Sequence, residues 1–99
     1  MTVEIQYQKM PESESLNTLL KKRLLKLAKR YQWLIRAQVM FKLSNQKNGE
    51  NKICEIELSA PGPRLFAKSN MDNFEKAMVD TIEELDRQLQ KRKERFERH

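Results

Sequence analysis

Residues 16–31 read LNTLLKKRLLKLAKRY, and this stretch predicts the element around which the rest of the fold is arranged. Its apolar residues recur at spacings of three and four, so they share one face of an α-helix. Ser13 suits the N-cap position, and Glu12 and Glu14 place negative charge near the positive end of the helix dipole. We predict a helix over residues 14–31. Its apolar stripe comprises Leu16, Leu19, Leu20, Leu24, Leu27, Ala28 and Tyr31.

Stretches on either side of this helix alternate between apolar and polar residues, which is the pattern of half-buried strands. Ile35 is the first apolar residue of one such stretch. Asn48-Gly49 suits a hairpin turn because both residues tolerate positive φ, and residues 60–63 (Ala-Pro-Gly-Pro) suit a second turn. We predict strands over residues 3–7, 35–43, 54–58 and 64–69.

A second apolar stripe at helical spacing begins near Asp72 and predicts a C-terminal helix. It comprises Phe74, Ala77, Met78, Ile82, Leu85, Leu89 and Phe96. The order β-α-β-β-β-α implies one parallel crossover followed by two antiparallel hairpins. Each helix has one apolar stripe and each strand one apolar face. We therefore predict an α+β fold, a four-stranded mixed sheet with two helices on one face, as in double-stranded-RNA-binding domains.

The length of 99 residues suits one domain, and we expect residues 1–99 to form a single core. One cysteine excludes an internal disulfide. The first ten residues lack the basic and then apolar pattern of a secretion signal, and no stretch is long and apolar enough to span a bilayer. We expect a cytoplasmic protein.

The composition is a poor match to catalysis, because a nucleophile needs an adjacent base and the only histidine is His99. Cys54 falls in the apolar register of its strand, so we expect a buried small hydrophobe rather than a nucleophile or a metal ligand. Glu55 and Glu57 are expected to face solvent. With two glycines and no metal-ligand spacing, the sequence predicts no enzyme, no cofactor and no metal site.

Charge is the most informative property of the chain, with a net charge of +6 and a pI of about 9.6. Ten basic residues face four acids in residues 1–50, whereas residues 51–99 contain ten of each. Six basic residues and no acid lie between Lys21 and Arg30. This clustering favours a polyanionic partner, and RNA in particular, whose phosphates and 2′-hydroxyls can be read by shape.

Helix phase predicts that these charges are sorted by face. On the first helix the basic flank consists of Lys22, Arg23, Lys26, Lys29 and Arg30. On the last helix it consists of Arg87, Lys91, Arg95 and Arg98. The acids of the last helix fall mostly on the other flank: Glu75, Glu83, Asp86, Glu94 and Glu97. Two helices lying side by side are expected to present the basic flanks as one continuous surface.

The chain resembles the ribosome hibernation-promoting factors and ribosome-associated inhibitors, also called protein Y or modulators of sigma-54, over nearly its whole length. The resemblance is carried by the order of elements, by the first helix, by RAQVMFKLS at residues 36–44 and above all by LDRQLQKRK at residues 85–93. The last of these fits the family's LxRQLxKxK pattern. The resemblance implies that the two helices contact 16S ribosomal RNA in the A-site and P-site channel of the small subunit. It also implies inhibition of translation by occupancy, under stress or in stationary phase.

By position, the family's RNA-contacting residues fall on Arg23, Lys26, Arg87, Lys91 and Lys93, of which Lys93 alone lies off the basic flanks. The predicted RNA-binding set is Lys22, Arg23, Lys26, Lys29, Arg30, Arg87, Lys91, Lys93 and Arg95. Many members have Asp-Met-Tyr where residues 73–75 of this chain read Asn-Phe-Glu, so no contact of that tyrosine is carried over.

Long members of the family also have a C-terminal domain that pairs ribosomes. We expect this short form to lack that domain, to be a monomer off the ribosome, and to need a second small hibernation factor if ribosomes pair. Two other functions stay open. A general double-stranded RNA-binding module binds plain duplexes without preferring ribosomes, and a protein-interaction regulator needs an exposed apolar patch.

Overall fold

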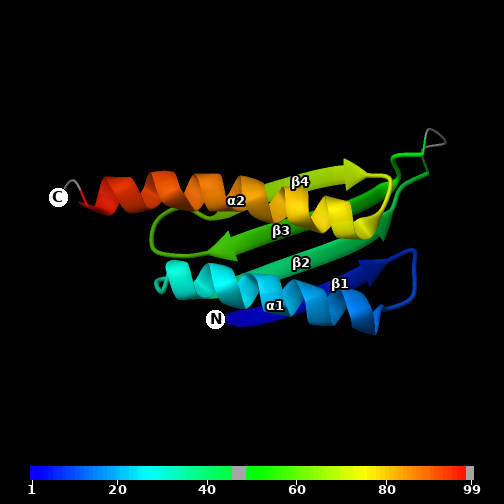
Figure 1. Cartoon of the computed structure of the whole chain (residues 1–99), viewed down its shortest axis with the longest axis horizontal. Helices are drawn as coiled ribbons and strands as arrows, with labels where there is room; N and C mark the ends of the chain where they lie inside the picture. Colours follow the sequence, from blue (N-terminus) through cyan, green and yellow to red (C-terminus); the bar gives the residue numbers. More distant parts are fainter. Residues whose placement is uncertain (46–48, 98–99) are drawn as a thin grey trace.

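The computed structural model describes residues 1–45 and 49–97, and its elements follow the predicted order β-α-β-β-β-α (Figure 1). They are β1 (Thr2–Gln8), α1 (Glu14–Arg30), β2 (Arg36–Leu43), β3 (Lys52–Ser59), β4 (Leu65–Met71) and α2 (Phe74–Glu97). Asn48 of the predicted hairpin turn lies outside the described residues, as do Arg98 and His99. Gly49 has a φ of 84°, in the left-handed region that glycine adopts without strain.

The four strands lie in the order β1-β2-β3-β4, with β1 and β2 parallel and the other neighbours antiparallel. α1 provides the crossover that a parallel pair requires. The register aligns Tyr7 with Phe41, Phe41 with Cys54, and Cys54 with Ser69, so these four side chains form a row on one face of the sheet. Both helices cover that face (Figure 1). The predicted α+β fold is confirmed.

Side-chain caps determine where both helices start. The Ser13 hydroxyl accepts a hydrogen bond from the Leu16 amide at 3.3 Å, which confirms the predicted N-cap. Asn73 caps α2 in the same way, because its Oδ1 accepts from the Lys76 amide at 2.7 Å. The last helix therefore begins two residues later than predicted. α1 ends at Arg30, and the non-helical Tyr31 follows, one residue short of the predicted end.

One core lies between the sheet and the helices. Leu20 and Leu24 of α1 and Leu85 and Leu89 of α2 are fully buried there, against the inward-facing residues of the strands. Cys54 is also fully buried, as predicted. Burial raises the pKa of its thiol to about 12, so the thiol stays protonated near neutral pH and is a poor nucleophile.

The apolar pattern misplaced two side chains, and it did not include a third that is buried. Ile35 precedes β2 and is 59% exposed, so its predicted place in the core is wrong; its backbone bonds to Thr2 and Ser59, but its side chain stays uncovered. Phe96 is 45% exposed, because the apolar stripe of α2 is only partly buried in its last turn. Conversely, Ile53 is buried beside Cys54 and breaks the alternation of β3. No described helix is long and apolar enough to cross a membrane.

Candidate nucleic-acid interface

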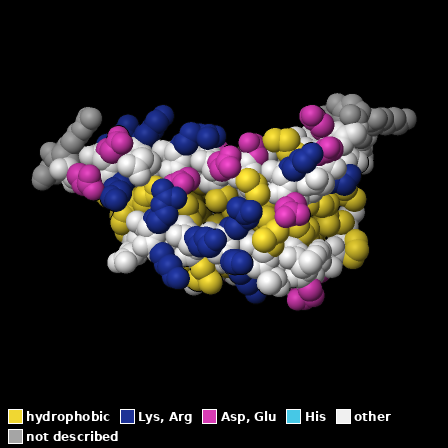
Figure 2. Space-filling view, viewed as in Figure 1, with side chains coloured by type: hydrophobic (Ala, Val, Ile, Leu, Met, Phe, Trp, Pro, Cys, Tyr) yellow, Lys and Arg dark blue, Asp and Glu magenta, His cyan; other side chains and the backbone are white. Residues whose placement is uncertain are grey.

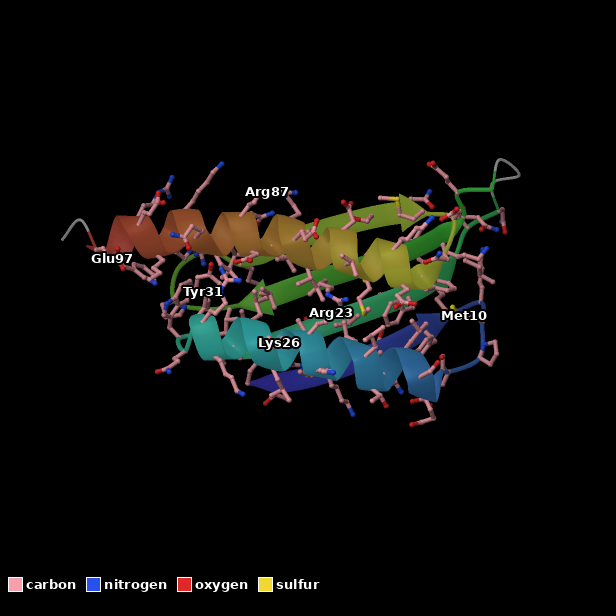
Figure 3. The ribbon with its side chains drawn as sticks, in the orientation of Figure 1. Met10, Arg23, Lys26, Tyr31, Arg87 and Glu97 are labelled. Atoms are coloured by element: carbon pink, nitrogen blue, oxygen red, sulfur yellow. The ribbon has the colours of Figure 1, made fainter. Side chains whose placement is uncertain are left out.

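The first basic area, which we call the α1 flank, consists of Lys22, Arg23, Lys26, Lys29 and Arg30. All five residues come together on α1, and all except the half-buried Arg23 are exposed. Figure 3 shows Arg23 directed into the space between the two helices. Within residues 1–45 and 49–97, Arg30 alone of the five forms an ion pair with a carboxylate. Four cations of this flank are therefore not neutralised by the described part of the chain.

A shallow cavity of about 490 Å³ extends this area along the outer surface of α1. It is lined by Thr18, Lys21, Lys22, Leu25, Lys26 and Lys29. Leu25 is 59% exposed and forms an apolar centre among the lysines. Lys21 was absent from the predicted set because helix phase assigns it to the opposite flank. The acid-free run that starts at Lys21 was the signal that pointed to it.

A polar seam joins α1 to α2 beside this flank. Arg30 Nη1 donates to Asp86 Oδ2 at 2.7 Å, and the buried Tyr31 hydroxyl donates to Asp86 Oδ1 at 2.6 Å and to Gln90 Oε1 at 3.2 Å. Burial, together with the hydrogen bond to Asp86, raises the pKa of Tyr31 to about 12. Asp86 also raises the pKa of the Arg30 guanidinium. The seam thus reduces the positive charge of Arg30 that is available to a partner.

The second basic area, the α2 flank, consists of Arg87, Lys91 and Arg95. Residues seven apart share a helix face, and the residues seven positions before these three are Asp80, Glu84 and Gln88. Two of the earlier residues contact β4, because Ser69 donates to Asp80 at 2.6 Å and Gln88 donates to the Phe66 carbonyl at 3.0 Å. The α2 flank therefore lies on the β4 side of α2, and Figure 3 shows Arg87 on the side away from α1.

Arg87 is paired within its own helix. Its Nε and Nη2 donate to Glu84 Oε2 at 3.0 and 2.7 Å, and Gln88 Nε2 reaches Glu84 Oε1 at 3.5 Å. The hydrogen bond from Arg87 lowers the pKa of Glu84, and the same bond raises the pKa of Arg87. Lys91 also lowers the pKa of Glu84 through its charge. One carboxylate thus offsets part of the positive charge of the α2 flank.

The single continuous surface expected from helix phase is wrong. A cavity of about 410 Å³ between the two basic areas is lined by Arg30, Glu83, Asp86, Arg87 and Gln90. Figure 2 shows Lys and Arg side chains gathered on α1 and along the far edge of α2, with Asp and Glu side chains between them. Phase shows which flank of a helix is basic, but it does not show which flank faces the neighbouring helix.

Two cations of α2 lie off its basic flank. Lys93 follows Asp86 by seven residues, so it is on the α1-facing side near the end of the helix. Arg92, which was not predicted, lies over the turn between β3 and β4, where its Nη1 donates to the Pro61 carbonyl at 3.3 Å. Its guanidinium is 3.7 Å from the point where a side chain at Gly62 would begin. Arg92 occupies a core-facing position of the apolar stripe, so no charge pattern indicated it.

The uncovered face of the sheet does not add to the basic surface. A cavity of about 210 Å³ on it is lined by polar and apolar residues that include Glu4, Glu55 and Glu57. Glu55 pairs with Lys42 at 2.7 Å, and Glu57 pairs with Arg64 at 2.7 Å. The two glutamates are placed on the outer face, as predicted. No group of three or more metal-ligating side chains occurs among the residues that the structure describes.

Comparison with known proteins identifies the family. The family model described as "Sigma 54 modulation protein / S30EA ribosomal protein" matches residues 3–97. No curated protein matches the chain.

Two solved structures have a similar fold. A ribosomal subunit interface protein from Coxiella burnetii is 22% identical with a TM-score of 0.84, over 94% of this chain and 98% of that chain. The N-terminal domain of Thermus thermophilus Protein Y is 19% identical with a TM-score of 0.78, over 92% of this chain and 98% of that chain. At these identities the likeness concerns the fold. Because the family model covers nearly all of the sequence, the chain belongs to the sigma 54 modulation protein / S30EA ribosomal protein family.

Proposed function

We propose that the chain binds 16S ribosomal RNA at the A and P sites of the small ribosomal subunit and keeps the ribosome idle under stress or in stationary phase. The observation that carries this proposal is the α1 flank, where four cations have no carboxylate partner in the described residues. Family membership supports a ribosomal target. The name of the structural neighbour from Coxiella burnetii, a ribosomal subunit interface protein, is consistent with it.

The geometry suits recognition of RNA by its backbone. Side chains cannot read bases in the deep, narrow major groove of A-form RNA, so a convex helical surface contacts phosphates and 2′-hydroxyls. Lys22, Lys26 and Lys29 stand exposed along the outside of α1, within reach of such groups. The α2 flank offers a second, weaker set of contacts. Inhibition then follows from occupancy of the site, with neither turnover nor a cofactor.

Co-sedimentation with purified small subunits tests the proposal. We expect stoichiometric binding at low salt and weak binding to free large subunits. Each phosphate contact contributes about −0.7 to −0.9 to the slope of log affinity against log salt, so four contacts give a slope of about −3. A protein that stays in the supernatant at low salt, or that prefers large subunits, contradicts the proposal.

Competition with transfer RNA tests where the chain binds. If it occupies the A and P sites, excess initiator transfer RNA should displace it, and the chain should reduce protein synthesis in a purified translation system. Simultaneous saturation of small subunits by both ligands would place the binding site elsewhere.

Competition with plain RNA duplexes distinguishes the proposed function from that of a general double-stranded RNA-binding module. We expect a duplex with as many phosphates as the occupied site to compete poorly with small subunits. Equal competition would favour the general module. Among the exposed large apolar residues of the described chain, Leu25 lies on α1, Phe66 on β4 and Phe96 on α2, so these three do not form the single apolar patch that a protein-interaction regulator needs.

A further inference from the structure

A chain of aromatic rings leads from the α1 flank to the end of α2. The Arg30 guanidinium lies 5.3 Å from the centre of the Tyr31 ring, whose centre is 5.7 Å from that of Trp33. The Trp33 ring in turn packs edge-to-face with Phe96, with centres 5.2 Å apart and an angle of 78°. The rings become more accessible along this path, because Tyr31 is 1% exposed, Trp33 is partly buried and Phe96 is 45% exposed.

The exposed end of this chain lies in a basic environment. Arg92 and Lys93 precede Phe96 by four and three residues, which makes them its neighbours on the helix surface. The other two cations of residues 91–97, Lys91 and Arg95, belong to the α2 flank on the β4 side, so Arg92 and Lys93 are the cations that border the ring. A half-exposed aromatic ring bordered by cations matches the surfaces on which nucleobases stack, because stacking needs a π-face and the cations hold the adjoining phosphates.

We propose that Phe96, supported by Trp33, is a stacking site for an unpaired nucleobase of the RNA that the α1 flank holds. This inference rests on the proposed function and adds a single-stranded element to the RNA that is recognised. The site tolerates any base, because stacking does not depend on hydrogen-bonding edges. Packing of Phe96 on Trp33 alone would stabilise the end of α2 without any effect on RNA.

The experiment uses hexaadenylate and an abasic hexanucleotide with the same number of phosphates. Trp33 is the only tryptophan, so its fluorescence reports directly on this site. We expect hexaadenylate to quench Trp33 and to bind about tenfold more tightly than the abasic chain, within the roughly five- to hundredfold gain per stacked base. Equal affinities with no quenching overturn the proposal.

Phe96→Leu keeps an apolar contact with Trp33 but removes the π-face, and it should abolish most of the preference for hexaadenylate. Phe66→Leu is the matched control, because Phe66 is a similarly exposed phenylalanine, 52%, on the opposite face of the sheet. It should leave the preference unchanged. If the two variants behave alike, or if Phe96→Leu only lowers the melting temperature, the ring serves packing and the proposal is wrong.

Co-sedimentation of the wild type and Phe96→Leu with small subunits separates the two possible failures. A wild type that does not bind small subunits contradicts the proposed function, whatever the oligonucleotides show. Salt-dependent binding of the wild type, combined with equal affinity for the two oligonucleotides, contradicts only the stacking site.

Discussion

The α1 flank and the α2 flank are both basic in sequence but differ in how much of their charge is available to a partner. Lys22, Arg23, Lys26 and Lys29 have no carboxylate partner in the described residues, whereas Arg87 is held by Glu84 within its own helix. The difference begins in the sequence, because residues 21–30 contain no acid while α2 interleaves acids and bases at helical spacing. A count of basic residues therefore overstates the charge that the α2 flank offers to a partner, relative to the α1 flank.

The largest expected effect on RNA binding comes from removing three cations of the α1 flank, and it is compared with the removal of three cations of the α2 flank. Lys22, Lys26 and Lys29 changed together to Gln should reduce the magnitude of the salt slope by about two to three. The triple variant of the α2 flank (Arg87, Lys91 and Arg95 to Gln) should reduce it by about one, because Glu84 already offsets part of that charge. The slope is measured from small-subunit binding between low and moderate salt.

Three paired cations of the sheet face provide a control of equal charge. Lys42, Arg64 and Lys68 all lie within ion-pair distance of Glu55 or Glu57. Changing these three to Gln should leave the slope almost unchanged. If all three triple variants weaken binding equally, net charge rather than a defined surface determines affinity.

A smaller effect is expected from opening the seam. Asp86→Ala removes the nearer acceptor of the buried Tyr31 hydroxyl and leaves only the longer contact with Gln90, so it should lower the free energy of unfolding by about 1–3 kcal/mol. Asp86→Asn keeps an acceptor oxygen but releases Arg30, so it should strengthen RNA binding and steepen the slope by about one. Glu83→Ala is the control for stability. Unchanged binding by Asp86→Asn would show that Arg30 does not reach the RNA.

The Tyr31 hydroxyl also makes stability depend on alkaline pH. Its pKa is about 12 in the folded protein against an ordinary value of 10.0, so below pH 10 both states are protonated and the stabilisation is complete. As the pH rises from about 10 through 12, the unfolded state ionises first and the free energy of unfolding falls. Denaturant unfolding of the wild type and Tyr31→Phe should converge over this range. If the difference in the free energy of unfolding between the two proteins stays constant from about pH 10 to 12, the raised pKa of Tyr31 is contradicted.

The smallest expected effect comes from freeing Arg87. Glu84→Gln removes the carboxylate that accepts from its Nε and Nη2, and it should tighten RNA binding a few-fold at low salt. The gain should disappear at high salt, because exposed charges are screened. Glu97→Gln, at the end of the same helix, controls for a general loss of negative charge. If both variants tighten RNA binding equally, the ion pair between Arg87 and Glu84 does not limit RNA binding by the α2 flank.

Much of the fold could be predicted because its signals are local. Periods of 3.6 and 2 identified both helices and all four strands, and Ser13 was correctly assigned as a cap. The errors lie at element ends. Ile35 continues the alternation of β2, but it is exposed because no helix packs over its side chain. A sequence pattern does not show where the helices stop covering the sheet.

The candidate site, like the fold, could be predicted only where its signals lie within one element. The position of the α1 flank on its helix could be predicted, because one helix positions all five members and no acid interrupts the run, whereas their contact with RNA stays a prediction. The seam was not predicted, since Arg30 and Asp86 are 56 residues apart and no sequence spacing relates them. The contact between Trp33 and Phe96 was missed for the same reason.

The sequence by itself determined which residues form the helices and strands, which side chains face the core away from the element ends, and that the charge gathers on two helix flanks. These properties depend on the backbone geometry of each element and on hydrophobic burial, which act over a few residues. Only the tertiary structure decided that the α1 flank borders an acidic seam while the α2 flank lies on the β4 side. The physical reason is that the orientation of one helix relative to its neighbour is set by their joint packing on the sheet.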